Sequence, residues 1–216
     1  MWGIPVNWRK LWLYFVVASA ILMMIGGCAS SKDTDLVEGK INVITTFYPL
    51  YDFSVKIGGE HAHVINLVPA GVDSHDWSPK SKDVQHIQDA DLFIYNGLGF
   101  EGWTDRLLAG MEADTSPHVV LATKGIDLLK MDEAHHDEAG HEHEHGTEEH
   151  DEHDGEYDPH AWLSPLQARK YAENIKEGFI AVDPEHQADY EANYAQVAAK
   201  LDELHEKYKR VTESAE

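Results

Sequence analysis

Short β-branched segments alternate with amphipathic segments from about residue 41, and this alternation restricts the fold more than any other feature. The segments rich in Val, Ile and aromatic residues, each bounded by polar residues, are predicted strands at 41–46, 63–69, 91–97 and 118–123. Apolar residues at helical spacing predict helices at 48–57, 80–89 and 101–111. Alternating strands and helices with short connections predict an α/β fold whose parallel sheet is covered on both faces. Ligands of such sheets bind at the carboxyl ends of the strands.

Two further helices are predicted in the last third of the chain. Ser164-Pro165 is typical of an N-cap followed by proline at the first helical position, which opens a helix to about residue 182. From about residue 185 to the end, apolar residues three or four apart form one stripe. A helix of about 30 residues spans roughly 45 Å, so it is either a coiled coil or a helix that crosses between two lobes. The chain stops directly after the stripe, and we expect a second lobe to be missing.

The first residues indicate export. Arg9 and Lys10 precede an apolar run at 11–25 that is too short to span a bilayer, and small residues follow, as in a secretory signal. The run ends in Ile-Gly-Gly before Cys28, the single cysteine, and resembles the lipobox of bacterial lipoproteins. That resemblance implies a signal peptide at 1–27 and a lipid on Cys28, followed by a polar tether at 28–40. The alternative is an uncleaved signal anchor.

An acidic, histidine-rich insert interrupts the α/β pattern at residues 132–157. It holds no aliphatic residue larger than alanine and cannot bury a core, so we expect disorder or a loop in the absence of metal. Histidines interleaved with carboxylates offer many weak chelating arrangements, and they are predicted to bind metal. These residues are His135, His136, His141, His143, His145, His150 and His153. The alternative, a solvated acidic linker, explains the carboxylates but not the histidines.

The charge of the chain excludes some partners. Its formal net charge is −22, with 39 acidic residues against 17 basic ones, and nucleic-acid binding requires a basic face. An acidic field outside a cell favours cations. A metal hydrolase is also disfavoured, because the sequence lacks H-E-x-x-H or a comparable motif with a general base beside the ligands.

Two short motifs each place a histidine in a turn. His75 lies in GVDSHDWSP directly after the second predicted strand, where Asp73 or Asp76 could orient its ring. His160 lies in DPHAWLSP, where Pro159 restricts the backbone and Trp162 anchors the segment. Taken singly, His75 could be a solvated surface residue and His160 a satisfied core histidine. His61 and His63, an H-x-H pair at the start of a strand, are expected at the surface.

Together these motifs resemble the metal-binding lipoproteins of zinc and manganese ABC uptake systems. The resemblance extends to INVITTFYPLYDF after the tether and to DLFIYNG leading into the turn at 97–101. It implies two α/β lobes joined by a long rigid helix, with metal held between them. His75 and His160 then match the two ligands of the N-terminal lobe, at 41–182, and the interlobe helix is 183–216. The remaining ligands would come from the missing C-terminal lobe.

The resemblance also implies the biology. We expect a binding protein and no enzyme: an extracellular, lipid-anchored zinc receptor on the bacterial cytoplasmic membrane that delivers metal to the permease of an ABC importer. In this family, a histidine-rich loop just before the DPH motif is typical of members specific for zinc. Imidazole ligands also bind zinc more tightly than manganese. The alternative is a metal-buffering surface lipoprotein that binds zinc only through the loop.

Overall fold

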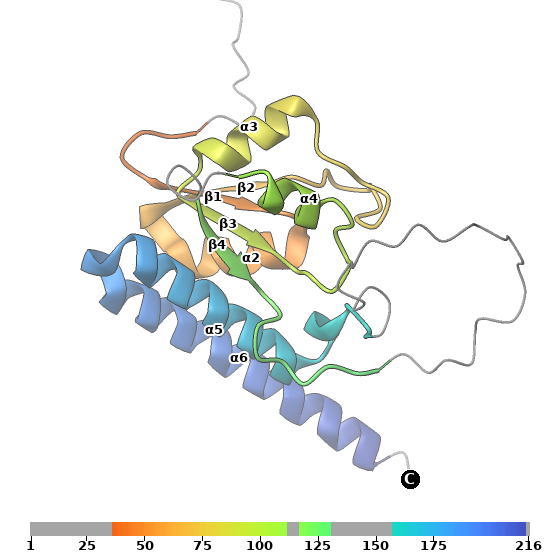
Figure 1. The fold of residues 1–216 in the computed structure, drawn as a ribbon. Helices are drawn as coiled ribbons and strands as arrows, with labels where there is room; N and C mark the ends of the chain where they lie inside the picture. The colour runs from red at the N-terminus through yellow and green to blue at the C-terminus, as the bar shows by residue number, and fades with distance from the viewer. Residues whose placement is uncertain (1–35, 112–116, 131–156, 215–216) are drawn as a thin grey trace, which may run out of the picture. The chain divides into compact units, whose positions relative to one another are not determined.

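A parallel sheet of four strands forms the centre of the part of the chain that the structure describes, which comprises residues 36–111, 117–130 and 157–214. In this computed structural model the strands are β1 (Ile41–Thr45), β2 (Ala62–Asn66), β3 (Leu92–Tyr95) and β4 (His118–Leu121). They lie in the order β2-β1-β3-β4, and every neighbouring pair is parallel (Figure 1). All four strands are at the predicted places.

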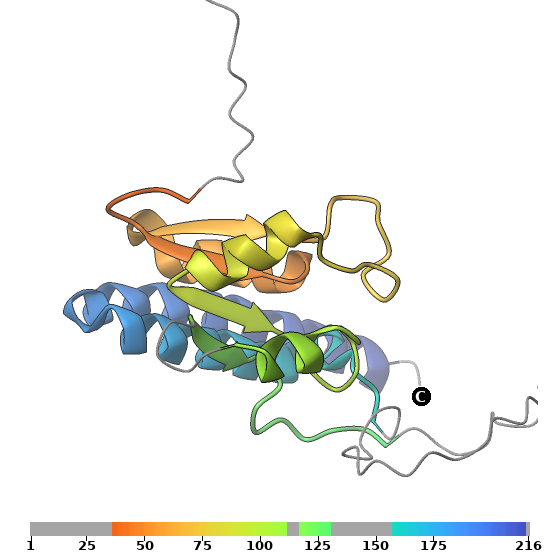
Figure 2. The same cartoon turned by 45° about the horizontal axis from the view of Figure 1, so that its top comes forward.

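Helices cover both faces of this sheet, as predicted. Helices α2 (Tyr48–Gly58), α5 (Pro165–Val182) and α6 (Gln187–Glu213) lie on one face, whereas α3 (Ser81–Asp89) and α4 (Thr104–Ala109) lie on the other (Figures 1 and 2). Short 3-10 turns at Gly59–His61, Ala161–Leu163 and Pro184–His186 complete the connections. The α/β fold class is therefore confirmed.

Each face of the sheet has its own apolar core, because successive residues of a buried strand point to opposite sides. Val43 and Leu92 pack with α2 and α5 on one side, and Ile44 and Phe93 pack with α3 and α4 on the other. These four residues are fully buried. Burial on both faces explains why the strands are nearly continuous runs of apolar residues.

All four strands and the helix predicted at 101–111 are shorter than the sequence predicted; β1, β3 and β4 end at Thr45, Tyr95 and Leu121 rather than at residues 46, 97 and 123. The second strand ends at Asn66 rather than at residue 69, since its neighbour β1 already ends at Thr45; Leu67 and Val68 still donate to the carbonyls of Thr45 and Thr46. The helix predicted at 101–111 spans only Thr104–Ala109. The preceding residues form a tight turn instead, which is described with the metal centre below.

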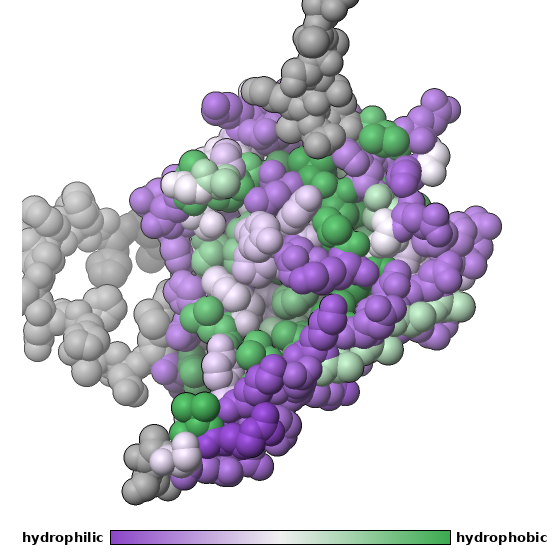
Figure 3. All heavy atoms as spheres, turned by 180° about the vertical axis from the view of Figure 1, so that it is seen from behind, coloured by the Kyte–Doolittle hydropathy of each residue, from purple (hydrophilic) through white to green (hydrophobic). Residues whose placement is uncertain are grey.

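The apolar stripe of α6 is only half covered. Tyr190 and Val197 are buried against α2 and α5, while Leu204, Tyr208 and Val211 near the end of the helix are 38%, 54% and 66% exposed. Figure 3 shows this helix from behind as a band of hydrophilic residues with a hydrophobic spot near its C-terminal end. The packed half fixes α6 to the lobe, and the distal half presents apolar side chains to solvent.

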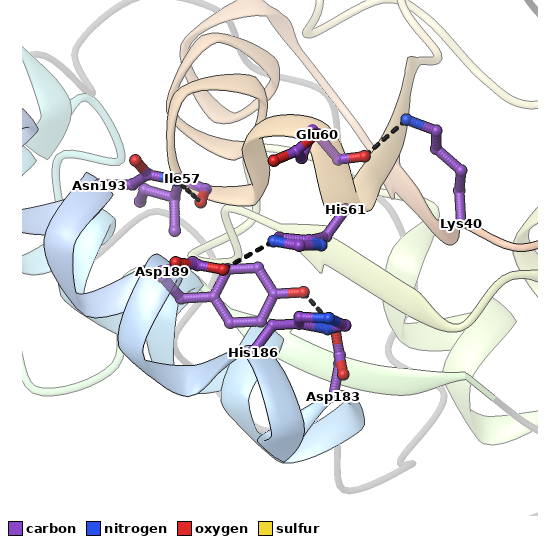
Figure 4. Close-up of polar contacts among 9 residues, drawn as sticks. Lys40, Ile57, Glu60, His61, Asp183, His186, Asp189 and Asn193 are labelled. Atoms are coloured by element: carbon purple, nitrogen blue, oxygen red, sulfur yellow. Dashed lines mark hydrogen bonds and ion pairs between the residues drawn. The ribbon is translucent and has the colours of Figure 1, made fainter.

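A cluster of histidines and carboxylates fastens the start of α6 to the sheet (Figure 4). The rings of His61 and His186 stack with centroids 3.9 Å apart. His61 Nε2 lies 2.9 Å from Asp189 Oδ2, and His186 Nδ1 lies 2.7 Å from Asp183 Oδ2, which also accepts the hydroxyl of Tyr190. His61 was expected at the surface, but this stacking and the contact with Asp189 leave its side chain only 20% exposed.

Several predicted segments lie outside the described residues: the signal at 1–27, Cys28, most of the tether, and the seven histidines of the insert. Among the helices that the structure describes, none is long and apolar enough to cross a membrane.

The cluster at the start of α6 predicts pH-dependent stability. The hydrogen bond between His186 and Asp183 raises the pKa of His186 above 6.5. Burial alone would raise the pKa of Asp183, but the hydrogen bonds that it accepts from Tyr190 and His186 lower this pKa below 3.8. The pair of protonated His186 and ionised Asp183 therefore makes its full contribution to the stability of the fold between pH 3.8 and pH 6.5. This contribution is lost as pH rises through the raised pKa of His186. We expect His186→Gln to lower the thermal midpoint more at pH 5.5 than at pH 8.

Scanning calorimetry at both pH values measures the difference, with His205→Gln, farther along the same helix, as the matched control. If His186→Gln lowers the thermal midpoint by the same amount at both pH values, this account of the cluster is wrong.

Candidate metal centre

The loops that follow the four parallel strands meet at one edge of the sheet, and both predicted ligand histidines lie there. His75 belongs to the loop between β2 and α3, and His160 belongs to the segment between β4 and α5. Their side chains come from positions 85 residues apart in the sequence, yet their Nε2 atoms are 3.1 Å apart. The fold thus brings together the two residues that the motifs singled out.

Asp158 fixes the direction of the His160 ring. Its Oδ1 accepts the backbone N–H of His160 at 2.9 Å and lies 2.7 Å from the ring Nδ1. These two hydrogen bonds outweigh partial burial and lower the pKa of Asp158 below 3.8. Because an ionised carboxylate only accepts, the ring proton resides on Nδ1 and the lone pair of Nε2 faces His75. This is the carboxylate–histidine pairing that typically orients a metal ligand.

His75 is held mainly by its backbone and by an aromatic ring. Its N–H donates to Asp73 Oδ1 at 3.0 Å, so this carboxylate stabilises the turn. Asp73 or Asp76 was predicted to orient the ring itself, but Asp73 accepts from the backbone instead. The edge of the imidazole packs on Phe100, with centroids 4.5 Å apart.

The separation of the two nitrogens suits a shared metal ion. Two imidazole nitrogens each about 2.0–2.1 Å from a tetrahedral zinc lie roughly 3.3–3.4 Å apart, and the observed separation of His75 Nε2 and His160 Nε2 is 3.1 Å. Within the described ranges, no group of three or more His, Cys, Asp and Glu residues is arranged to hold a metal. A structural zinc site usually has four ligands, so these two nitrogens alone would be half of such a set.

Aromatic side chains form one wall of the centre. The ring of Phe100 contacts both imidazoles, with its centroid 4.5 Å from that of His75 and 5.9 Å from that of His160. The same ring packs against Phe47 and Trp162, with centroids 4.7 and 5.1 Å away. Phe100 is only 4% exposed. An apolar wall excludes water from one side of the imidazoles and lowers the local dielectric, which strengthens electrostatic interactions with a bound cation.

A left-handed turn after β3 places Phe100 in this wall. Gly97, Leu98 and Gly99 have φ values of 82°, 58° and 72°, a conformation that is costly for leucine and natural for glycine. The carboxylate of Glu101 closes the turn by accepting the N–H groups of Asn96 at 2.8 Å and Gly97 at 3.0 Å. This arrangement replaces the first turn of the helix predicted at 101–111.

No role at the site was predicted for Glu101. The residue is only 4% exposed, and the pKa of its carboxyl is raised because burial outweighs the hydrogen bonds from Thr46 and from the turn. The available signal was an acidic residue two positions after a G-x-G sequence that directly follows a buried strand. A carboxylate in that position can satisfy the free N–H groups of a left-handed turn.

Substitution of the first glycine of this turn tests its backbone strain. Gly97→Ala forces a side chain into the left-handed region, at about 1–2 kcal/mol, and its Cβ would lie 2.4 Å from Leu121 Cδ1. We expect the free energy of unfolding, measured with urea, to fall by at least that amount. Gly102→Ala is the matched control, because a Cβ there meets nothing within 4 Å. Equal effects of the two substitutions would contradict this description of the turn.

Two imidazoles that converge at the carboxyl edge of a parallel sheet are the arrangement expected of an α/β metal-binding lobe. The profile of the family described as "Zinc-uptake complex component A periplasmic" matches residues 43–216. The chain belongs to this family, and the resemblance inferred from its motifs is confirmed.

Relatives with known names agree with the family. The high-affinity zinc uptake system protein ZnuA of Bacillus subtilis is 38% identical over 210 residues, which cover 96% of this chain and 63% of that protein. The zinc-binding lipoprotein AdcA of Streptococcus pneumoniae is 36% identical over 193 residues, covering 89% of this chain and 36% of AdcA. The chain thus spans less than two thirds of the length of either relative.

Solved structures share the fold. The metal-dependent lipoprotein YcdH of B. subtilis has a TM-score of 0.65 at 36% identity and is matched over 79% of this chain and 55% of its own. The Zn(II)-bound ZnuA-like domain of S. pneumoniae AdcA has a TM-score of 0.64 at 34% identity and is matched over 79% of this chain and 55% of its own. The Mn-bound periplasmic metal-binding protein of Candidatus Liberibacter asiaticus gives 0.59 at 30% identity, covering 74% of this chain and 53% of that one.

Proposed function

We propose that the chain is the metal-capturing lobe of an extracellular zinc receptor that feeds an ABC importer, with His75 and His160 as ligands. The observation that carries the proposal is the convergence of two Nε2 atoms at 3.1 Å, one of them on a ring oriented by a carboxylate. Neutral imidazole is a good ligand for zinc. The other ligands belong to a second lobe beyond the described residues.

Zinc is the proposed cargo in preference to manganese. Two nitrogen ligands in the first lobe favour zinc, whereas manganese prefers carboxylate and carbonyl oxygen. The named relatives ZnuA and AdcA are zinc proteins. A manganese-bound relative has the same fold, so the metal preference depends on the ligands and not on the sheet. The net charge of −22 favours the approach of any divalent cation.

Capture rather than catalysis fits the arrangement of acidic groups. A metal hydrolase requires a general base free to accept a proton from metal-bound water. The carboxylate nearest the pair, Asp158, is engaged by the backbone and the Nδ1 atom of His160. Its role is therefore to orient a ligand.

The partners follow from the same proposal. A lipid on Cys28 would hold the receptor on the outer face of the cytoplasmic membrane, and the residues after it would act as a tether. The lobe would then present its metal to the permease of the importer. The name "zinc-binding lipoprotein" of the AdcA relative supports anchoring.

Loss of either ligand should abolish tight zinc binding. Loss of a residue that merely orients a ligand typically weakens metal affinity about 10–100-fold, and loss of a ligand itself should exceed this. We expect His75→Ala and His160→Ala each to weaken the tightest site at least about 100-fold in competition with a chromophoric chelator, measured on a protein that includes both lobes. His205→Ala should bind like the parent. Unchanged tight binding in both ligand variants would remove these residues from the site.

The second candidate function is metal buffering by the histidine-rich insert. A specific observation favours a link between the insert at 132–157 and the centre: Lys130 and Tyr157, the described residues that flank positions 131–156, form an antiparallel bridge, and the N–H of Asp158 donates to Leu129 O at 2.8 Å. This bridge lies three residues before His160 in the sequence. We propose that the insert collects zinc weakly beside the tight site.

This bridge allows the insert to be removed cleanly. Residues 131–156 are replaced by Asn-Gly, the two-residue turn preferred between antiparallel partners, so that Lys130 and Tyr157 keep their pairing. In zinc calorimetry of the two-lobed protein we expect one tight site to remain and the weak sites to disappear. If all zinc binding is lost, the protein is a buffer and the receptor proposal is wrong.

A further inference from the structure

Asn96 uses all its polar groups at the edge of the sheet, directly after β3, where its side chain is fully buried. Its side-chain Nδ2 donates to Pro159 O at 3.1 Å and to Gly97 O at 3.1 Å, and its Oδ1 accepts the hydroxyl of Tyr171 at 2.6 Å. Its backbone carbonyl accepts the hydroxyl of Thr123 at 2.7 Å. A buried amide with every group satisfied is rigid.

The bond to Pro159 acts directly on the His160 ligand. The carbonyl of Pro159 and the N–H of His160 belong to one planar peptide unit. The carbonyl side of that plane is held by Asn96 Nδ2, and its N–H side is held by Asp158 Oδ1 at 2.9 Å. With the plane held on both sides, the backbone cannot rotate without breaking a hydrogen bond, so the starting direction of the His160 side chain is set.

Tyr171 determines which way the Asn96 amide points. The amide oxygen and nitrogen are similar in shape, but only Oδ1 can accept the Tyr171 hydroxyl. Tyr171 is fully buried in α5, and burial raises the pKa of its phenol, so the hydroxyl keeps its proton. The carbonyls of Pro159 and Gly97 can only accept, so they and the hydroxyl donated to Oδ1 together direct Nδ2 toward Pro159.

The same residue also connects to the other ligand. The backbone N–H of Asn96 donates to the carboxylate of Glu101, which closes the left-handed turn that presents Phe100. Phe100 packs on the His75 ring. Asn96 thus contacts, through its side chain, the peptide that carries His160 and, through its backbone, the turn that supports His75.

We propose that Asn96, oriented by Tyr171, is a positioning residue that holds the two ligand histidines at the separation required by the metal. This inference rests on the proposed function, since it assumes that His75 and His160 bind zinc. It extends that function by assigning preorganisation of the site to a residue that does not touch the metal. Ligands held in place before binding lose less conformational freedom when the metal arrives.

The test compares three substitutions in the two-lobed protein whose seven insert histidines are changed to asparagine. Tyr171→Phe removes the hydroxyl that orients the amide, and Asn96→Asp removes the donor to Pro159. Thr123→Val is the matched control, because it removes a buried hydrogen bond to the backbone of the same residue and leaves the amide alone. Zinc affinity, the cobalt(II) absorption spectrum and the thermal midpoint are measured for each.

We expect Tyr171→Phe and Asn96→Asp to weaken zinc affinity about 10-fold or more, the size of effect typical of groups that orient a ligand, and to alter the cobalt(II) bands. Thr123→Val should lower the thermal midpoint by a similar amount to Tyr171→Phe while zinc affinity and spectrum stay those of the parent. If Asn96→Asp does not fold, Tyr171→Phe decides. Parent-like affinity in Tyr171→Phe, or an equal loss in Thr123→Val, overturns the inference.

His75→Ala, measured in parallel, separates this inference from the proposed function. If the parent binds zinc tightly and His75→Ala does not, the function stands and only the Asn96 variants bear on positioning. If His75→Ala binds like the parent, both the proposed function and the role of Asn96 are wrong.

Discussion

The parallel pairing of β1 with β2 and β3 is the constraint on which the centre depends. Parallel strands all end at the same edge of their sheet, so the loops that follow them are neighbours whatever their distance in sequence. Thr45 pairs with Asn66 at the ends of β1 and β2, and Tyr95 pairs with Leu121 at the ends of β3 and β4. The His75 loop and the 97–101 turn start from that edge, and the His160 segment returns to it. A shift in register would separate the imidazoles.

On this edge, rigid backbone compensates for exposed side chains. The side chain of His160 is 39% exposed, and exposure alone would leave it mobile. Asp158 accepts hydrogen bonds from the ring and the backbone N–H of His160, and Asn96 donates to the adjacent carbonyl of Pro159; these bonds restrict that mobility. The strain of Leu98 in a left-handed conformation is maintained by the buried carboxylate of Glu101. Strained turns held by their surroundings are typical of binding sites.

The sheet, its helices and the two histidines were predictable from sequence for definite reasons. Short runs of β-branched and aromatic residues mark the strands, and helical spacing of apolar residues marks the helices. The turn residues around His75 and His160 mark positions after a strand and before a helix. The role of Glu101 carried only a weak signal, its position two residues after Gly-x-Gly, because its partners are backbone N–H groups of the turn and the hydroxyl of Thr46, which lies 55 residues away. Asn96 was missed for a related reason: its partners Pro159 and Tyr171 lie 63 and 75 residues away. The half-buried position of His61 likewise depends on packing against α6.

Anomalous X-ray scattering at the zinc absorption edge tests the central claim most directly. Crystals of the two-lobed protein are grown with one equivalent of zinc, and the anomalous peak is located. The account predicts a single strong peak about 2.0–2.1 Å from both His75 Nε2 and His160 Nε2, with Asp158 still bonded to the His160 ring. A peak at the histidine-rich insert alone, with none between His75 and His160, would contradict it.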